Sequence, residues 1–277
     1  MISKERQALL DKVKEYEKKE MFDVDVNIDP VTKELLPEDV DYLCKKFKSK
    51  IKRKIANFIA DKYFLNLIKK DILIIDKIEN EELLIDAFKE GAIVTCNHFS
   101  PFDNYIVFHS IRKYLPKKYL YKVIREGNYT NFPGLYGFFF RNCNTLPLSS
   151  NKRTMMNFLS SVSTLLKNKE SILIYPEQAM WWNYKKPRPF KIGAFKIACK
   201  NNVPIVPLFI SFEDDGKVDN EGENLKRHTL HVLKPLLPNN ELKGKEREID
   251  LLNRTFLQYK EKYEEVYQKP LVYKDDE

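Results

Sequence analysis

The chain has 277 residues, 43% hydrophobic and 13% aromatic, which is enough for a substantial core in one large domain. Its net charge of +8 indicates an attraction to anionic lipid headgroups, an acidic carrier protein, phosphorylated substrates or nucleic acid, or a solvated lysine-rich surface. The four cysteines are widely spaced and form no CxxC pair, which argues against a zinc site and against a disulfide framework.

The first ten residues contain Lys4, Glu5 and Arg6 and no apolar segment, so the sequence predicts no signal peptide. No stretch approaches the roughly 18 uncharged apolar residues that a spanning helix requires. We therefore expect a cytosolic protein or a peripheral protein on the cytoplasmic face of a membrane.

Residues 3–20 are typical of a charged helix, and residues 21–37 of an irregular connector. A second helix is predicted from Glu38, because Pro37 and two acids stand where a helix N-terminus favours them. Its apolar positions recur at steps of three and four residues and form one face: Leu43, Phe47, Ile51, Ile55, Phe58 and Ile59.

This second helix is strongly basic, with no acid from Leu43 to Ala60. Its cations are Lys45, Lys46, Lys48, Lys50, Lys52, Arg53 and Lys54. A basic amphipathic helix suits an anionic membrane surface, because its cations meet headgroups while its apolar edge enters the acyl boundary. The alternative is a helix that packs its apolar face on the main domain, and both can hold at once. We predict that residues 1–70 form an N-terminal helical, membrane-docking segment.

Short apolar runs alternate with helical patterns after Lys70. The predicted strands are Ile72–Asp76, Ala92–Asn97, Tyr119–Ile124, Ser171–Tyr175, Val203–Ile210 and His228–Leu233. The predicted helices are 79–90, 104–113, 151–169, 190–201 and 246–268. This alternation predicts an α/β fold, a largely parallel central sheet covered by helices, with the N-terminal helices as an appendage. The strands are apolar throughout, as expected when helices cover both faces of the sheet.

A histidine at the end of a predicted strand is the first candidate for chemistry. His98 directly follows Ala92–Asn97, at the position where open α/β sheets place their active sites. Asp103 lies five residues on, in the first turn of the next helix, and can hydrogen-bond one ring nitrogen so that the other takes a proton from a hydroxyl. By itself the pair is a weak signal, because this spacing arises often by chance.

The surroundings of this pair strengthen the signal. Residues 97–103 read Asn-His-Phe-Ser-Pro-Phe-Asp and match Asn-His-x-Ser-x-x-Asp, the first signature of the glycerolipid acyltransferases. Three further blocks follow in the family's order: Gly137–Arg141, then Tyr175–Glu177 continued by Pro189–Phe195, then Val203–Pro207. The chain therefore resembles the family of 1-acylglycerol-3-phosphate acyltransferase and the lysophospholipid acyltransferases over residues 90–210, with residues 71–277 as the acyltransferase domain.

The resemblance implies transfer of a fatty acyl group from acyl-CoA or an acyl carrier protein to the hydroxyl of a lysophospholipid-like acceptor, in phospholipid biosynthesis. His98 would be the general base and Asp103 would steer it. Arg141 would hold a phosphate, Glu177 would hydrogen-bond the acceptor hydroxyls or brace its loop, and Lys122 would add to a cationic wall. The thioester is already activated, so no nucleophilic side chain, metal or cofactor beyond this co-substrate is expected.

The third block departs from the family pattern, in which Gly-Thr-Arg follows the glutamate. Here the positions are Gln178, Ala179 and Met180, so the arginine that the family uses near the acceptor phosphate is missing. One explanation is that a later cation supplies the charge: Lys185, Lys186 or Arg188. The other is a bulkier or uncharged acceptor such as a glycolipid, bound beside Trp181 and Trp182, although those rings also suit loop packing or anchoring at a membrane interface.

Two other functional classes compete with an enzyme. A non-catalytic membrane lipid-binding protein is disfavoured by the intact His98 and Asp103. A nucleic-acid binder is disfavoured because no known binding module occurs, and a serine hydrolase because no Gly-x-Ser-x-Gly elbow occurs. The remaining histidines are not expected to be catalytic or to bind metal: His109, His228 and His231.

Overall fold

The computed structural model describes residues 3–26, 32–219 and 222–273. Within these ranges, seven strands form one sheet in the order β1-β7-β6-β2-β5-β3-β4. The strands are β1 (Ile74–Glu79), β2 (Ala92–Cys96), β3 (Leu120–Ile124), β4 (Thr145–Pro147), β5 (Ser171–Ile174), β6 (Ile205–Val218) and β7 (Asn224–Val232).

The helices are α1 (Lys4–Lys18), α2 (Phe47–Lys69), α3 (Asp103–Ile111), α4 (Glu126–Thr130), α5 (Gly134–Asn142), α6 (Lys152–Lys167), α7 (Gly193–Asn201) and α8 (Gly244–Tyr267). Two short 3₁₀ turns, η1 (Pro37–Asp39) and η2 (Glu81–Leu84), complete the described elements.

Strands β6, β2, β5, β3 and β4 run parallel to one another, whereas β7 is antiparallel to β6 and β1 is parallel to β7. The predicted largely parallel sheet is therefore confirmed. The carboxyl ends of β2, β3 and β5 share one edge of the sheet, where active sites of open α/β sheets form.

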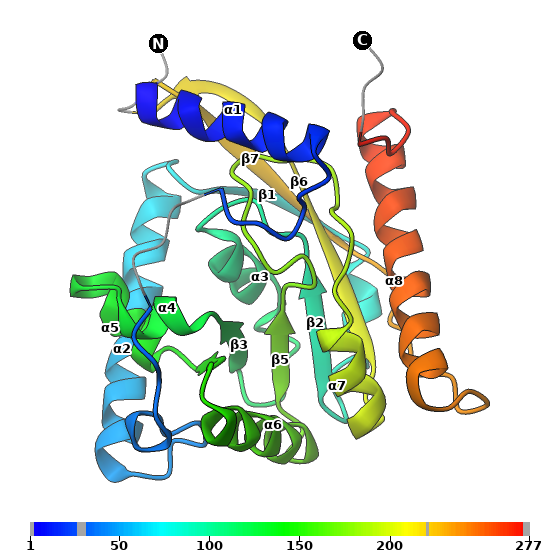
Figure 1. Cartoon of the computed structure of the whole chain (residues 1–277). Coiled ribbons are helices and arrows are strands. Elements are labelled where there is room, and N and C mark those ends of the chain that lie inside the picture. The colour runs from blue at the N-terminus through cyan, green and yellow to red at the C-terminus, as the bar shows by residue number, and fades with distance from the viewer. Residues whose placement is uncertain (1–2, 27–31, 220–221, 274–277) are drawn as a thin grey trace.

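Helices cover both faces of this sheet (Figure 1). On one face, Phe158 of α6, Phe195 of α7 and Tyr259 of α8 join one core cluster. On the other face, α3 and the C-terminal half of α2 pack on the sheet in a second cluster. Strand β2 supplies Ile93 to the first cluster and Val94 to the second, and all five of its residues are buried, as expected for a strand that helices cover on both faces.

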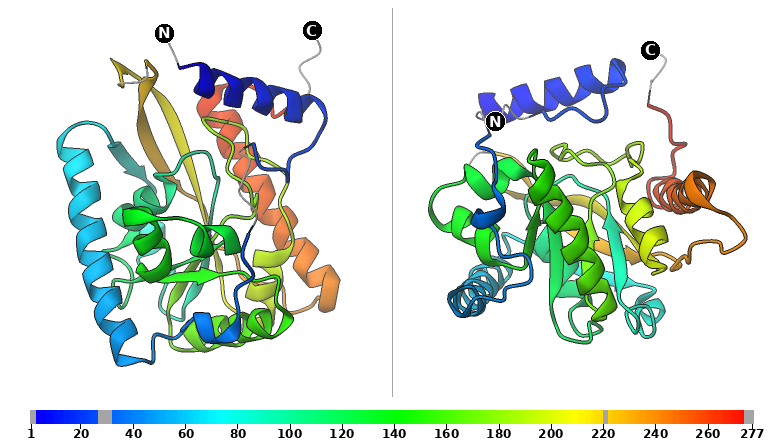
Figure 2. Two further views of the ribbon diagram at one scale, coloured as in Figure 1. Left: turned by 60° about the vertical axis from the view of Figure 1, so that its left-hand side comes forward. Right: turned by 60° about the horizontal axis from the view of Figure 1, so that its bottom comes forward.

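The two N-terminal helices lie at different places on this sandwich (Figures 1 and 2). Helix α1 lies across the end of the sheet at which the parallel strands terminate, and its Val13 packs with Trp181 from the loop after β5. Helix α2 runs along one side, where Ala56 packs against Phe139 of α5. Both helices therefore lie next to the edge of the sheet that carries the chemistry.

The predicted start of the second helix was wrong by nine residues, because only the short turn η1 forms at Pro37 and α2 begins at Phe47. Cys44 has a φ of 52°, which interrupts a right-handed helix. The Asp41 carboxylate accepts hydrogen bonds from the backbone N–H groups of Lys45 and Lys46, which stabilises this turn in place of a helical one.

Two other local expectations differ from the structure. The helix predicted at residues 79–90 is only the turn η2, since β1 extends to Glu79. The second block, for which no secondary structure was predicted, forms the helix α5; α4 before it and the short strand β4 after it were not predicted either. A run of apolar residues fits either a buried strand or a buried helix, and here length did not decide between them.

The apolar face of α2 does not pack on the domain. Exposed fractions range from 37% to 76% for Phe47, Ile51, Ile55, Phe58 and Ile59. Among the described residues, no helix combines the length and the hydrophobicity that crossing a membrane requires. An outward apolar stripe on a helix rich in lysine is the pattern of an interfacial helix.

Gly137 of α5 is required by close packing. A methyl group on its Cα would lie 1.9 Å from the carbonyl oxygen of Phe132. We expect Gly137→Ala to lower the free energy of unfolding by about 1–3 kcal/mol in denaturant titrations, because the backbone must shift to accommodate the methyl group. Gly193→Ala is the matched control, since no atom lies within 4 Å of its added methyl group. Equal stabilities of the two variants would contradict this reading.

Candidate active site

The site is built from loops that follow neighbouring parallel strands. His98 comes two residues after β2, Arg125 directly after β3, and Tyr175 directly after β5. Parallel strands present their carboxyl ends at one edge, so these side chains gather although they are far apart in sequence. All three line one cavity of about 1280 Å³.

The loop after β2 is fixed by its own polar side chains. Asn97 exchanges two hydrogen bonds with the backbone of Ile210 on β6, at 2.9 and 2.8 Å, and so continues the pairing of β2 with β6. The Ser100 hydroxyl accepts a hydrogen bond from the N–H of Phe102 at 3.2 Å, in the turn before α3. These two residues of the first block therefore set the backbone that carries His98.

The His98 ring and the Asp103 carboxylate form the central interaction. Nδ1 of His98 lies 2.9 Å from Oδ2 of Asp103. The same oxygen accepts hydrogen bonds from the N–H groups of Phe99 and Ser100 at 2.9 and 3.0 Å. Because this oxygen acts as an acceptor, Nδ1 carries the proton in the neutral form of the ring, and the lone pair of that form is on Nε2. Asp103 is fully buried, whereas 17% of the His98 side chain is exposed, so the imidazole can meet a substrate.

The third block holds the histidine from behind. The rings of His98 and Tyr175 stack with centroids 3.9 Å apart and 14° between their planes. The Glu177 carboxylate accepts a hydrogen bond from the backbone N–H of His98 at 3.3 Å. Burial raises the pKa of Tyr175 well above its usual range, so its ring stays neutral beside the imidazole. Glu177 thus braces the loop, one of its two expected roles.

Aromatic and aliphatic side chains form most of the cavity wall beside His98. They include Phe64, Phe108, Phe132, Phe139, Phe140, Leu159 and Ile197. Helix α2 supplies part of this wall through Asn57, Ala60 and Phe64. A volume of about 1280 Å³ with such a lining is large enough for an extended alkyl chain next to the histidine.

Three cations on the cavity wall stand out. Lys122 was expected there, and its ammonium donates to the carbonyl oxygens of Leu120 and Cys143, both at 3.2 Å. Burial lowers the pKa of Lys122. Arg125 and Lys191 also line the cavity, and sequence reasoning missed both. The signal for Arg125 was available, because it follows β3 as His98 follows β2.

Two acids from the segment after α1 approach these cations. Asp23 pairs with Lys191 at 2.9 Å, and Asp25 pairs with Arg125. Both acids line the same cavity. Residues 22–26 therefore close one side of the cavity and place carboxylates where an anionic headgroup would find positive charge.

Arg141 does not line this cavity. Helix α5 presents Tyr136, Phe139 and Phe140 to it. Arg141 lies on another face of α5, in the wall of a second cavity, and its guanidinium donates to the carbonyl oxygens of Tyr129 and Phe132 at 3.2 and 3.0 Å. The structure thus separates Arg141 from His98, in contrast to the expected phosphate contact at the catalytic site.

Arg188 is turned into the protein. Its guanidinium is fully buried and binds the Glu177 carboxylate at 2.9 Å, while its backbone N–H donates to the same carboxylate at 3.1 Å. Burial raises the pKa of Glu177, and Arg188 acts in the opposite direction. The sequence had suggested that Glu177 and Arg188 contact an acceptor. Neither side chain lines the cavity, so the structure does not place them in such a contact.

The altered positions themselves, Gln178, Ala179 and Met180, line the cavity, whereas the side chains that follow them in the loop face elsewhere. Lys185 is exposed over the rings of Phe212 and Tyr267, and Lys186 pairs with Glu17 of α1. Trp181 is fully buried against α1 and donates from Nε1 to the carbonyl oxygen of Val24 at 2.9 Å. Loop packing, one of the roles considered for the tryptophans, therefore describes Trp181.

The remaining histidines lie elsewhere. His228 contacts the carbonyl oxygen of Ile74 at 2.9 Å, and His231 lies between Ser211 and Glu79 at 2.8 and 2.7 Å. His109 packs beside the Tyr105 ring. Within the described ranges, no group of three or more His, Cys, Asp or Glu side chains is arranged to hold a metal ion.

A family model described as Acyltransferase matches residues 75–211, which contain the His98–Asp103 pair and all four blocks. The chain belongs to the glycerolipid acyltransferase family. Among solved structures, the 1-acyl-sn-glycerophosphate acyltransferase PlsC from Thermotoga maritima has a similar fold, with 19% sequence identity and a TM-score of 0.55. The alignment covers 82% of this acyltransferase and 86% of PlsC. No curated protein sequence matches the chain significantly.

The buried Glu177–Arg188 pair gives a test of how the acyltransferase holds its third block. Arg188→Met leaves a carboxylate buried without its cation, so we expect the free energy of unfolding to fall by about 3–5 kcal/mol in denaturant titrations. Adding Glu177→Gln should restore part of the loss, since the unpaired charge is then gone. Lys185→Met is the control on the exposed side of the same loop, and an equal loss there would refute the assignment.

Proposed function

We propose that the protein transfers a fatty acyl group from acyl-CoA or an acyl carrier protein to the hydroxyl of a lysophospholipid-like acceptor, in phospholipid biosynthesis. The observation that carries this proposal is the His98–Asp103 pair, with Nδ1 committed to the carboxylate and the ring at an apolar cavity. The family membership supports acyl transfer as the reaction.

The pair supplies the proton transfer that this reaction needs. Nε2 of His98 takes the proton of the acceptor hydroxyl, and the oxygen attacks the thioester carbonyl carbon. The carbon–sulfur bond then breaks, and the imidazolium returns the proton to the leaving thiolate. Asp103 stabilises the transient imidazolium through the 2.9 Å hydrogen bond.

The cavity offers separate places for the two ends of an amphiphilic acceptor. The phenylalanine-rich wall accommodates the alkyl chain, and Arg125 and Lys191 attract an anionic headgroup. Their present carboxylate partners, Asp25 and Asp23, would share or yield these cations when a phosphate binds. This arrangement would replace the missing third-block arginine with Arg125 from the loop after β3 and with Lys191 from the end of the third block itself.

A non-phosphatidic acceptor, such as a glycolipid, is the second candidate. The same two carboxylates favour it, because they reduce the net positive charge of the cavity and accept hydrogen bonds from sugar hydroxyls. Purified protein given a labelled acyl thioester and a panel of lysophospholipids and glycolipids decides between them, with the products read by mass spectrometry.

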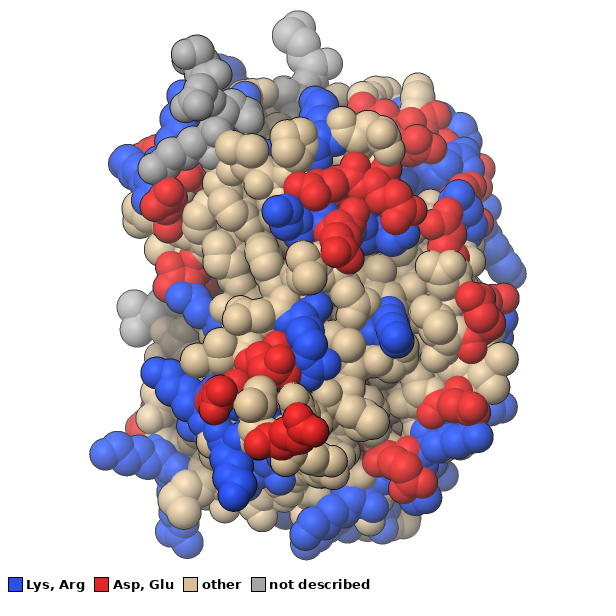
Figure 3. Space-filling model, turned by 90° about the vertical axis from the view of Figure 1, so that its right-hand side faces the viewer, with Lys and Arg blue, Asp and Glu red and all other residues tan. Residues whose placement is uncertain are grey.

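We further propose that the protein is peripheral on the cytoplasmic face of a membrane and docks through α2. The outward stripe of α2 is flanked by exposed Lys48, Lys50 and Lys54, so cations meet headgroups when the apolar residues enter the interface. The face that α8 forms is different, because acidic and basic side chains are interspersed there (Figure 3). Since α2 also lines the cavity, docking by this helix brings lipids close to His98.

His98→Ala and Asp103→Asn should each lower turnover of the acyl thioester by roughly 10²-fold or more, because a positioned general base is worth about that much. The measurement is steady-state acyl transfer, with circular dichroism to verify folding. His109→Gln is the matched control, a histidine on α3 that does not line the cavity. Normal turnover in His98→Ala would end the proposed mechanism.

Phe47→Ser combined with Phe58→Ser should weaken partitioning onto anionic vesicles at least about tenfold, since a buried phenylalanine contributes roughly 1.5–3 kcal/mol. Vesicle co-sedimentation measures this. Leu257→Ser on α8 is the control, because Leu257 is 52% exposed but lies outside the stripe. Unchanged partitioning of the double variant would show that α2 is not the docking helix.

A further inference from the structure

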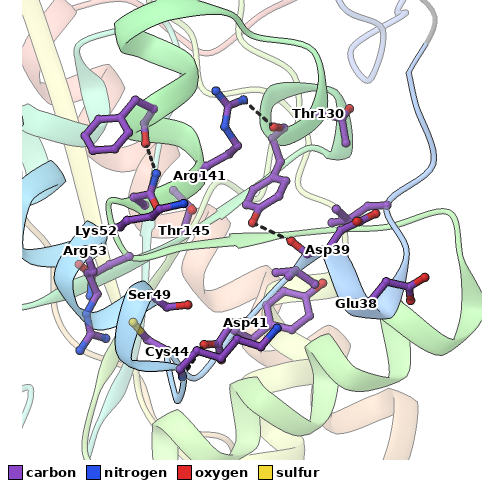
Figure 4. A pocket seen from close by; sticks show the side chains of 18 of the residues that line it. Glu38, Asp39, Asp41, Cys44, Ser49, Lys52, Arg53, Thr130, Arg141 and Thr145 are labelled. Carbon is purple, nitrogen blue, oxygen red and sulfur yellow. Dashed lines mark hydrogen bonds between the residues drawn. The ribbon is translucent and has the colours of Figure 1, made fainter.

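A second cavity, of about 500 Å³, lies where the connector before α2 meets α5 and the start of β4 (Figure 4). It is distinct from the cavity of His98. Phe138, Arg141 and Asn142 of α5 face the smaller cavity, while Tyr136, Phe139 and Phe140 of the same helix face the larger one. The two spaces approach each other at Thr145, which lines both.

Basic side chains converge on the smaller cavity from three segments of the chain. They are Lys33 of the connector, Lys46, Lys52 and Arg53 of the α2 region, and Arg141 of α5. Across the described parts of the chain, none of these cations forms an ion pair with a carboxylate. Arg53 contacts the Tyr121 hydroxyl at 3.2 Å, and Arg141 contacts only carbonyl oxygens. Five cations therefore face four carboxylates in this cavity, which leaves a net positive charge.

Four acids, Glu34, Glu38, Asp39 and Asp41, line this cavity, and three of them accept hydrogen bonds from neutral donors. Asp41 accepts hydrogen bonds from the backbone N–H groups of Lys45 and Lys46, at 3.0 and 2.9 Å. Asp39 accepts one from the N–H of Leu36 at 3.2 Å, and Glu34 accepts one from the side chain of Asn151 at 3.1 Å. These three carboxylates stabilise the turns before α2, and within the described residues none of them forms an ion pair with a cation of the cavity.

We propose that this cavity is a second binding site, for a phosphate group carried by a small polar molecule. Lysine ammonium groups and arginine guanidinium groups on several sides of a partly enclosed space are the donors that phosphate prefers. The tyrosine rings of Tyr42, Tyr121 and Tyr129 in the wall add flat surfaces against which the remainder of such a molecule can pack.

Two sources of this phosphate fit the location. One is the nucleotide end of a coenzyme A donor, whose acyl end would reach His98 past Thr145; this source rests on the proposed function. The other is the headgroup of a lipid in the membrane on which α2 lies, because Lys46 and Lys52 belong to the start of that helix. Phosphate binding itself depends on neither reading.

The test is titration calorimetry with two probes, adenosine 3′,5′-bisphosphate for the donor and glycerol 3-phosphate for the headgroup. Adenosine and glycerol are the uncharged controls. The cavity variant is Lys46→Gln with Lys52→Gln, two exposed side chains whose loss leaves the core intact. Its matched control is Lys48→Gln with Lys54→Gln, which removes the same charge from the same helix outside the cavity.

We expect at least one phosphate probe to bind, with a Kd that rises about tenfold in the cavity variant and less than about twofold in the control variant. His98→Ala should bind the probe as the wild type does, so a failure of the catalytic proposal would not affect this result. The probe that binds identifies the source. Equal weakening in both lysine variants, or no binding of either phosphate probe by the wild type, would overturn the proposal.

Discussion

The hydrogen bond between Nδ1 of His98 and the buried Asp103 carboxylate is the interaction on which the rest of the site depends. A buried carboxylate is costly unless it is hydrogen-bonded, and here Oδ2 accepts from the imidazole and from two backbone N–H groups, whereas Oδ1 has no hydrogen-bond partner among the described residues. Those donors exist only because β2 ends in a tight loop before α3. The conformation of the loop and the orientation of the histidine ring are therefore set by the same carboxylate.

The altered third block has a structural consequence that reaches the N-terminus. Trp181 and Arg188 both face inward, and both donate hydrogen bonds to backbone carbonyls of residues 22–26. That segment in turn places Asp23 and Asp25 beside cations of the cavity. The departure from the family pattern and the presence of α1 across the sheet edge thus belong to one arrangement. In place of the arginine of the family's third block, this chain has an N-terminal segment that closes one side of the cavity.

Helix α2 has an exposed apolar face and an inner face that packs on the domain. Its outward stripe remains exposed, while its inner face packs on α5 and lines the cavity. If α2 docks on a membrane as proposed, it would connect that surface to the candidate catalytic cavity over its own diameter, which is about 10–12 Å. The smaller cavity lies at the start of the same helix, so one element borders both candidate ligand sites.

The sequence alone determined the features that depend on neighbouring residues. These are the alternation of strands and helices, the position of His98 at the end of a strand, and the five-residue separation of Asp103 from His98. These follow because periodicity, turn residues and a five-residue separation are properties of neighbouring positions. Only the tertiary structure decided which other parts of the chain, or solvent, each helix face contacts. It turned Arg141 to another side of α5, buried Arg188 against Glu177, left the α2 stripe exposed and brought Arg125 to the cavity. Periodicity tells which residues share a face, but the partner of that face comes from distant parts of the chain.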